Sequence, residues 1–302
     1  MDRREFIGRS AQLAALAAVI QKQSVFGSEP ASPDLAVAKD GTPGGMVRRA
    51  VAELGGMGRF VKRGDVVVVK PNMSWDRLPE QGATTHPDVV REVVTLCFEA
   101  GARKVKVFDF TLNEARRCYK RTGIQKAAEE AGAEVQFVQD RKFKAVAFPM
   151  GEAIKSWEIY QDVLDADRLI NVPAAKHHNV PEAGISLGIK NLMGLIGGNR
   201  GQFHRNFARK IVDLSTRVKP DLVVLDAYRM LIRNGPSGGN LSDVVLKKHV
   251  IAGTDPVAVD GYGASLFNLQ PEKIPYLAEA KMRGLGENDL KKVVIKVIAC
   301  TS

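Results

Sequence analysis

The sequence predicts an α/β fold with a mainly parallel, mixed sheet and helices on both faces, in three layers. Short apolar runs rich in Val and Ile recur along the chain, as expected of strands that are covered on both sides. Segments with helical periodicity separate these runs, and this alternation is typical of parallel sheets. The 302 residues are 45% hydrophobic and 26% charged, an ordinary composition for a globular protein with a large core.

The clearest strand and helix follow each other directly. Residues 66–70 read Val-Val-Val-Val-Lys, which predicts a buried strand. A helix then begins with Thr85 or His86 as its cap and Pro87 in its first position. Gly101 suits the position beyond the helix end, because glycine readily adopts the left-handed conformation found there.

The other elements continue the alternation. Further strands are predicted at residues 104–109, 134–138, 169–173, 222–226, 250–254 and 293–299, and helices at 125–132 and 206–218. Residues 150–168 and 229–248 show neither period and are expected to be insertions or irregular connections. Because no internal repeat or low-complexity tract interrupts the chain, we expect residues 34–302 to form a single α/β domain.

The N-terminal segment is predicted to be an export signal. Asp2-Arg3-Arg4-Glu5-Phe6-Ile7-Gly8 resembles a twin-arginine signal, and a mildly apolar stretch follows it. As a helix that stretch would rise about 15 Å, half of what a membrane span needs. We expect residues 1–33 to be a leader read by the twin-arginine export machinery, and the mature protein to be periplasmic or otherwise extracytoplasmic, without a membrane span. An ordinary basic helix and an uncleaved tether remain alternatives, because no clean Ala-x-Ala cleavage site is present.

Charge and cysteine content exclude several classes of protein. The net charge of +10 suits an anionic partner. Nucleic acid is not expected, because the basic residues are dispersed and only 6% of the residues are aromatic. Cys97, Cys118 and Cys300 lack the spacing of zinc or iron–sulfur ligands. Cys97 falls on the apolar stripe of a helix and is expected to be buried, while the disulfide state of the three stays open.

Polar residues at the ends of predicted strands point to a site. In parallel α/β sheets, ligands bind beyond the carboxyl ends of the strands. Such residues here are Lys70, Asn72, Asp109, Asn171, Asp226 and Asp255. A single Asp in this position is more often a helix cap, and Asp255 before Pro256 fits that interpretation. The set as a whole favours a site, with Asp226 in it.

The segment from residue 171 to residue 201 is the richest in functional groups. Lys176-His177-His178 is followed by Lys190-Asn191, and residues 185–196 have the apolar spacing of a short helix. Gly197-Gly198-Asn199-Arg200-Gly201 could cradle an anion with its backbone amides. A tight glycine turn is the alternative, and no Gly-Lys-Ser/Thr follows to make the segment a Walker loop.

Five short motifs follow one another along the chain. They are Lys70-Pro71-Asn72, Lys176-His177-His178, Lys190-Asn191-x-x-Gly194, Asn234-Gly235-Pro236 and Asp255-Pro256-Val257-Ala258-Val259-Asp260. Together they resemble the domain of unknown function 362 family, roughly between residues 60 and 270. The resemblance implies no settled reaction. Many relatives carry ferredoxin-type cysteine runs, which this chain lacks, so no iron–sulfur cluster is expected. The family's usual Lys-Thr-His reads Lys176-His177-His178 here, which makes His178 the matching histidine.

These residues lead to one functional hypothesis and two alternatives. We expect an exported enzyme of unassigned reaction that binds an anionic small molecule or an unknown cofactor. Ligand binding is assigned to Lys70, Asn72, Lys176, Lys190, Asn191 and Arg200, and acid/base catalysis to His178 and Asp226. One alternative is a metal-binding protein, with His86, His178 and Asp226 as candidate ligands. The other is a non-catalytic periplasmic binding or maturation partner of a redox enzyme.

Overall fold

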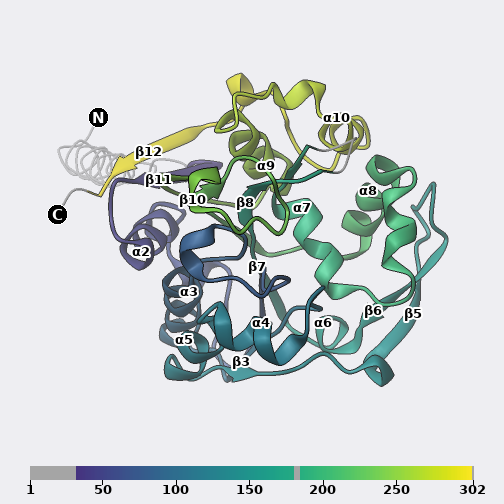
Figure 1. The fold of residues 1–302 in the computed structure, drawn as a ribbon, viewed down its shortest axis with the longest axis horizontal. Helices are drawn as coiled ribbons and strands as arrows, with labels where there is room; N and C mark the ends of the chain where they lie inside the picture. The colour runs from purple at the N-terminus through teal and green to yellow at the C-terminus, as the bar shows by residue number, and fades with distance from the viewer. Residues whose placement is uncertain (1–31, 180–183, 301–302) are drawn as a thin grey trace, which may run out of the picture. The chain divides into compact units, whose positions relative to one another are not determined.

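A long mixed sheet organises the protein (Figure 1). Over residues 32–179 and 184–300, which the computed structural model describes, this sheet has ten strands. Its main path joins β12 (Ile295–Ala299), β1 (Leu35–Lys39), β11 (Val244–Gly253), β10 (Leu222–Leu231), β7 (Arg168–Val172), β2 (Val66–Pro71), β3 (Lys104–Val107) and β4 (Glu134–Val135). Off this path, β8 (Ala174–His177) pairs with β10 and with β9 (Ile185–Ser186).

Most neighbouring strands run parallel, as the sequence predicts. From β10 through β7, β2 and β3 to β4 every pair is parallel, and so are β1 and β12. β11 runs antiparallel to both β10 and β1, which makes the sheet mixed. Lys70 pairs with Asn171 across β2 and β7, and Val69 pairs with Val107 across β2 and β3. The carboxyl ends of these three strands therefore lie side by side.

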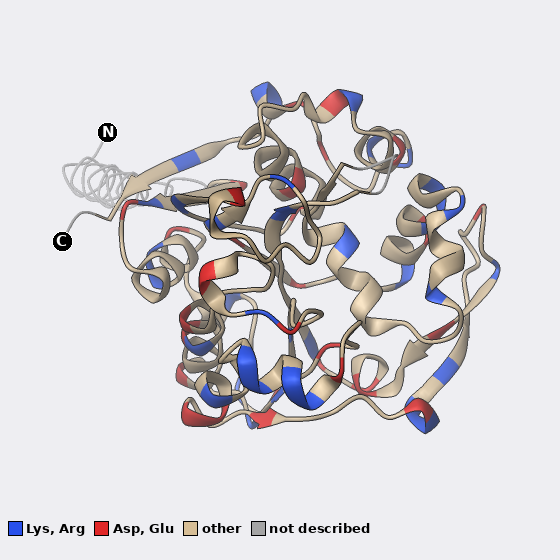
Figure 2. Cartoon of the chain, in the orientation of Figure 1, with Lys and Arg blue, Asp and Glu red and all other residues tan. Residues whose placement is uncertain are grey.

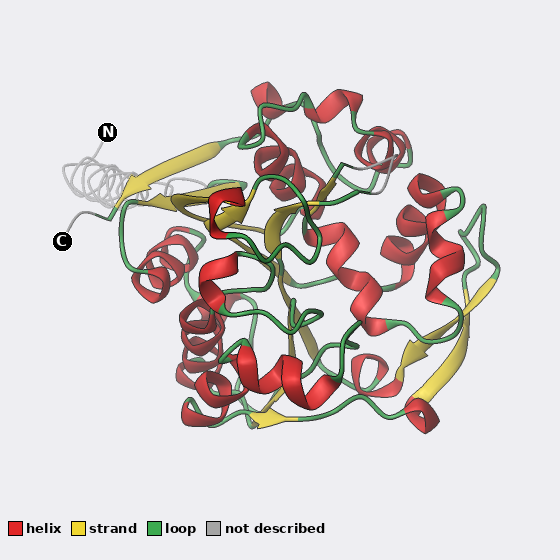
Figure 3. Cartoon of the chain, viewed as in Figure 1, coloured by secondary structure: helices red, strands yellow, loops and turns green. Residues whose placement is uncertain are grey.

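Helices cover both faces of the sheet, which confirms the three-layer fold (Figure 1 and Figure 3). On one face lie α2 (Pro43–Glu53), α3 (Pro87–Glu99) and α5 (Ile124–Glu130); on the other lie α7 (Gly188–Asn191), α8 (Phe207–Arg217), α9 (Pro256–Ser265) and α10 (Pro275–Met282). In β2, Val67 and Val69 pack into the core on the face covered by α2, α3 and α5, and Val68 packs into the core on the opposite face. Both faces of this strand are buried, which explains its unbroken valine run.

Two helix starts have the caps that the sequence predicts. His86 caps α3, because its Nδ1 accepts a hydrogen bond from the amide of Asp88 at 3.2 Å, and Pro87 occupies the first helical position. Asp255 caps α9, because its Oδ1 accepts hydrogen bonds from the amides of Val257 at 2.8 Å and Ala258 at 3.0 Å. The assignment of Asp255 as a cap is therefore confirmed.

Two stretches differ from the prediction of irregular structure. Residues 150–168 contain β6 (Ser156–Tyr160), which pairs antiparallel with β5 (Phe143–Ala147), and then α6 (Gln161–Leu164). Residues 229–248 contain the end of β10 and the first half of β11, paired with each other. That prediction was wrong because β6 and this half of β11 are largely exposed or partly exposed and lack a continuous apolar run.

The predicted leader lies almost entirely outside the described residues. From Pro33 onward the chain forms one compact unit. Among the helices of residues 32–179 and 184–300, none combines the length and the apolar character that crossing a membrane requires. Cys97 is buried in α3, as predicted, and Cys118 is also buried.

Candidate functional site

A cavity of about 180 Å³ lies at the carboxyl ends of β2 and β8. Its lining includes all six residues predicted to bind a ligand, together with one predicted catalytic residue: Lys70, Asn72, Lys176, Lys190, Asn191, Arg200 and His178. The ends of β2 and β8, together with α7 and the turn that carries Arg200, bring these residues together, in keeping with the general position of ligands in open α/β sheets. Among the described residues that line the cavity, none is acidic.

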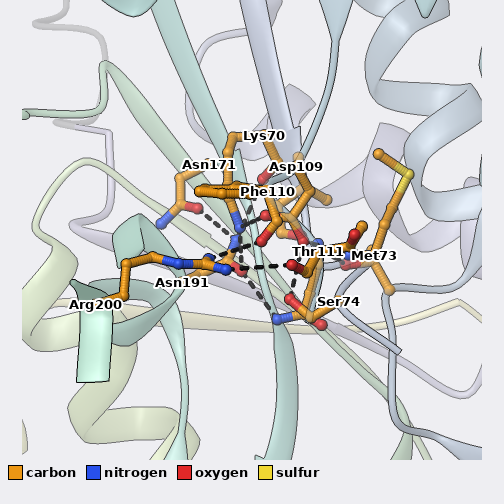
Figure 4. A network of polar contacts seen from close by, with 12 residues as sticks. Lys70, Met73, Ser74, Asp109, Phe110, Thr111, Asn171, Asn191 and Arg200 are labelled. Atoms are coloured by element: carbon orange, nitrogen blue, oxygen red, sulfur yellow. Dashed lines mark hydrogen bonds and ion pairs between the residues drawn. The ribbon is translucent and has the colours of Figure 1, made fainter. Parts of the chain in front are cut away.

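Lys70, which lines the cavity, forms an ion pair with the buried Asp109 (Figure 4). Both side chains are fully buried, and Lys70 Nζ lies 2.9 Å from Asp109 Oδ1. Lys70 is the penultimate residue of β2 and Asp109 follows β3, so the parallel register of these strands sets their separation. The other oxygen of Asp109 accepts hydrogen bonds from the amide of Met73 at 2.7 Å and from Ser74 Oγ at 3.1 Å.

Asn191 connects this pair to the neighbouring strand (Figure 4). Its Oδ1 accepts a hydrogen bond from Lys70 Nζ at 2.7 Å and another from Asn72 Nδ2 at 3.1 Å. Its Nδ2 donates to Asn171 Oδ1 at 2.8 Å. Asn171 in turn donates to the carbonyl of Gly188 at 2.8 Å, which fixes the start of α7. The position of Asn191 is therefore determined by β2 and β7 together.

Lys176 enters the cavity from β8. Its Nζ donates to Asn72 Oδ1 at 3.1 Å and also contacts the carbonyl oxygen of Ala83. Only 1% of Lys176 is exposed. Asn72 is itself held in place by its backbone amide, which donates a hydrogen bond to Thr85 Oγ1 at 2.8 Å. Lys176 thus has two neutral oxygen acceptors as partners.

Lys190 and Arg200 complete the basic wall. Lys190 Nζ lies 3.5 Å from Met193 Sδ and 5.3 Å from the ring centroid of Phe207, and the residue is 8% exposed. Arg200 donates to the carbonyls of Phe110 at 2.8 Å and Thr111 at 3.2 Å. Its guanidinium lies 3.9 Å from the ring centroid of Phe110. Neither side chain contacts a carboxylate in these interactions.

Burial and mutual repulsion shift the titration of these groups. Burial lowers the pKa of Lys176 to about 7, with Lys190 and Lys70 adding repulsion. Burial lowers the pKa of Lys190 to about 8, and Arg200 and Lys70 act in the same direction. The pKa of His178 falls to about 2, because the ring is buried beside Lys190 and Lys176. At physiological pH, His178 is therefore a neutral imidazole.

Two glycines of the sequence motifs are required by close packing. A Cβ at Gly194 would lie 1.9 Å from Asp109 Oδ1 and 2.6 Å from Lys70 Nζ, so only glycine leaves room for the ion pair. A Cβ at Gly235 would lie 2.0 Å from the carbonyl oxygen of His177. The amide of Gly235 also donates to His177 Nδ1 at 3.1 Å. The motifs around residues 176, 194 and 235 thus meet around one cavity, whose mouth includes Pro236.

Asp260 anchors the helix that carries Lys190 and Asn191. Its Oδ1 accepts a hydrogen bond from the amide of Gly188 at 2.6 Å, and its Oδ2 accepts one from the amide of Ile189 at 3.0 Å. The hydroxyl of Tyr276 donates to Oδ2 at 3.1 Å. Burial raises the pKa of Asp260 to about 7, against the lowering effect of these donors.

His86 and Asp226 lie together, but they do not line the cavity. Asp226 is 3% exposed, and its two oxygens accept hydrogen bonds from the amides of His86 at 2.6 Å and Tyr228 at 2.9 Å. Burial raises the pKa of Asp226 and lowers that of His86. The structure thus separates Asp226 and His86 from the cavity that His178 lines. Within residues 32–179 and 184–300, no three His, Cys, Asp or Glu side chains are arranged to hold a metal ion.

The glycine-rich segment at residues 197–201 has the geometry of a turn. The amide of Gly197 donates to the carbonyl of Glu158, and the amide of Arg200 donates to the carbonyl of Gly198, both at 3.0 Å. These two amides are therefore not available to an anion. Arg200 and Gly201 reach the cavity from this turn.

Several residues of the site were not assigned a role from the sequence. Asp109 and Asn171 were recognised as strand-end residues, and that position was the signal for both. Asp260 is the last residue of the motif that begins at Asp255, but the sequence assigns no role to it. Nothing in the local sequence indicated that Trp75 and Leu112 would lie at the cavity.

Comparisons with known proteins agree with the motifs. Residues 67–265 match the family described as Domain of unknown function (DUF362). Thylakoid-associated protein sll1697 of Synechocystis sp. is 27% identical over 248 residues, which cover 80% of this chain and 74% of the relative. Among solved structures, the lactate racemase apoprotein of Thermoanaerobacterium thermosaccharolyticum is similar with a TM-score of 0.45 and 12% identity, over 80% of this chain and 58% of that chain. Since the family match extends over more than half of the sequence, the chain belongs to the domain of unknown function 362 family.

Proposed function

We propose that this protein binds an anionic small molecule in the cavity at the strand ends and acts on it as an enzyme. The observation that carries the proposal is Lys190. Its amine is buried and lines the cavity, and the partners described for it are a thioether and an aromatic face. A buried ammonium without a counter-charge costs free energy. A carboxylate or phosphate bound in the cavity would provide the negative charge that Lys190 lacks among its described partners.

The charge balance of the whole site supports an anionic ligand. Asp109 neutralises Lys70, which leaves Lys176, Lys190 and Arg200 without a carboxylate in the contacts described above. A cavity of about 180 Å³ restricts the ligand to a small molecule. Exposed basic residues on α4 (Ala115–Arg121; Figure 2) lie close in sequence to Leu112, which lines the cavity. They would steer an anion toward the site.

The proposal is tested by thermal stabilisation and calorimetry with small anions, using oxalate and inorganic phosphate as probes. A bound anion at a concentration of about 100 Kd should stabilise the protein by about 2.7 kcal/mol. Lys190→Met should weaken binding by tenfold or more, about 1.4 kcal/mol, since it removes a charge-assisted contact. Without ligand, this variant should be the more stable protein by about 1 kcal/mol, because a buried charge is gone.

Lys106 offers a matched control for this substitution. It is a partly buried lysine of β3 that pairs with Asp162, and Asp162 keeps a second partner in Lys142. Lys106→Met should therefore leave anion binding unchanged. Equal affinities for the wild type and Lys190→Met would show that the cavity is not the anion site.

We further propose that the protein reaches an extracytoplasmic compartment through the twin-arginine pathway. The support is Arg3-Arg4 followed by Phe6 and a mildly apolar stretch. Replacing Arg3 and Arg4 together by Lys should retain the precursor in the cytoplasm, because the export receptor reads the arginine pair. Fractionation with a tagged full-length chain measures this, and unchanged export of the variant would exclude the route.

A further inference from the structure

The amine of Lys176 has an unusual set of partners for a lysine. Asn72 Oδ1 and the carbonyl oxygen of Ala83 each accept from it, and neither carries a charge. A neutral amine has two N–H groups and one lone pair. The two acceptors match the two N–H groups of a neutral amine, and the same lysine lines the cavity.

The surroundings of Lys176 favour this neutral form. The side chain is 1% exposed, and Lys190 and Lys70 are close enough to repel a positive charge on it. Burial lowers its pKa to about 7, so a large fraction of the molecules carry the free amine near neutral pH. A desolvated lysine beside other cations is a recognised form of an activated nitrogen nucleophile.

Lys190 differs in a way that favours the charged form. It lies near the face of the Phe207 ring, where a cation is attracted and a neutral amine is not. The two lysines of one cavity are thus suited to two tasks, one as a nucleophile and one as a binding cation.

We propose that Lys176 is a nucleophilic amine that forms an imine with a small anionic carbonyl compound, of the 2-oxo acid class, bound in the cavity. This inference rests on the proposed function, since Lys190 and Arg200 hold the carboxylate. The nitrogen lone pair of Lys176 attacks the carbonyl carbon, and a proton moves from nitrogen to the former carbonyl oxygen. The hydroxyl then takes up a proton and leaves as water while the carbon–nitrogen double bond forms, and the nitrogen gives up its second proton. One amine and one carbonyl give one imine and one water, with no oxidant or reductant.

The experiment traps the imine in the full-length protein. Wild-type protein is incubated at pH 7.5 with pyruvate and sodium cyanoborohydride, which reduces an imine to a stable secondary amine. Intact-mass measurement should show one added group, equal in mass to pyruvate less one oxygen atom. Peptide mapping should place that group on Lys176. Acetone, which has the carbonyl group without the carboxylate, should give a yield lower by roughly tenfold or more.

Variants separate Lys176 from the other lysines. Lys176→Arg keeps a positive charge and should lose the adduct. Lys190→Met should require a pyruvate concentration higher by about tenfold, because the carboxylate loses a partner. Lys106→Met should behave as the wild type. Because the adduct is also mapped in the wild type, the result does not depend on the folding of any variant.

The outcomes distinguish this inference from the proposed function. An adduct on Lys176 supports it. Absence of an adduct, or labelling of exposed lysines to the same extent with pyruvate and acetone, overturns it. Thermal stabilisation by oxalate, which has no ketone, is measured on the same preparation. Stabilisation by oxalate without trapping removes only the imine step, whereas loss of both removes the anion site as well.

Discussion

Asp109 and Asp226 are two buried carboxylates that come from different strands of the sheet and have different roles in this protein. Asp109, after β3, pairs with Lys70, one of the basic side chains that line the cavity. Asp226, within β10, accepts two backbone amides and fastens the start of α3 to the sheet. Both are at most 3% exposed. The difference is that Asp109 pairs with a lysine that lines the cavity, whereas Asp226 accepts hydrogen bonds from backbone amides.

The largest effect is expected at Asp109. Asp109→Asn leaves Lys70 buried without its counter-charge, close to three other basic groups. We expect the free energy of unfolding to fall by about 3–5 kcal/mol, the usual consequence of breaking a buried ion pair. Urea denaturation at pH 7 measures this. The double variant with Lys70→Met should regain part of the loss, and a single variant as stable as the wild type would disprove the ion pair.

At Asp226 a smaller effect on stability is expected, without an effect on the ligand. Asp226→Asn replaces one acceptor oxygen by a donor, so one of the two amide hydrogen bonds is lost, at about 1–3 kcal/mol. Oxalate affinity should stay within about twofold of the wild type, well below the tenfold that corresponds to 1.4 kcal/mol. A tenfold loss of affinity with unchanged stability would return Asp226 to the ligand site, where the sequence had placed it.

The pH dependence of this effect has a definite sign. Burial raises the pKa of Asp226, so the folded protein holds this proton more tightly than the unfolded chain. The contribution of Asp226 to stability is therefore fully present below the unfolded value of about 4, and is lost as the pH rises through the shifted pKa. The stability difference between wild type and Asp226→Asn should shrink from pH 4 toward neutral pH. Urea unfolding across this range checks it.

Ligand affinity should instead follow the lysines of the cavity. Burial holds the pKa of Lys190 near 8, so the free site loses this charge above that pH. Oxalate affinity should then fall by about tenfold for each further pH unit, with proton uptake on binding. Calorimetry in buffers of different ionisation enthalpy measures both. The profile should be flatter in Lys190→Met and unchanged in Asp226→Asn; a flat wild-type profile would contradict the assigned role of Lys190.

The smallest effect is expected at a residue that belongs to neither region. Cys97 is buried in α3, and burial raises its thiol pKa to about 12, so it stays protonated and unreactive. Cys97→Ala should reduce stability by about 1 kcal/mol through the small cavity that it leaves. Anion affinity and pyruvate trapping should match the wild type. Loss of either in a folded variant would reveal a thiol that takes part in the chemistry.

Much of the site could be predicted because a parallel sheet converts strand order into proximity. Lys70 and Asn171 are far apart in the sequence, yet they pair across adjacent strands. The sequence could not show that Asp226 would turn toward backbone amides, because that depends on where the start of α3 meets β10. Short, partly exposed strands such as β6 were missed because they contain no continuous apolar run.

The anchoring of α7 by Asp260 has a consequence for how the domain can be divided. The family match ends at residue 265, whereas Tyr276, which holds Asp260, lies on α10 beyond it. A fragment limited to the matched region would keep every lysine of the cavity. It would lose the hydrogen bond from Tyr276 to Asp260, and Asp260 holds the start of the helix that carries Lys190 and Asn191. The functional unit of this chain is therefore longer than its family signature, and shortened versions should retain the chemical groups while losing their alignment.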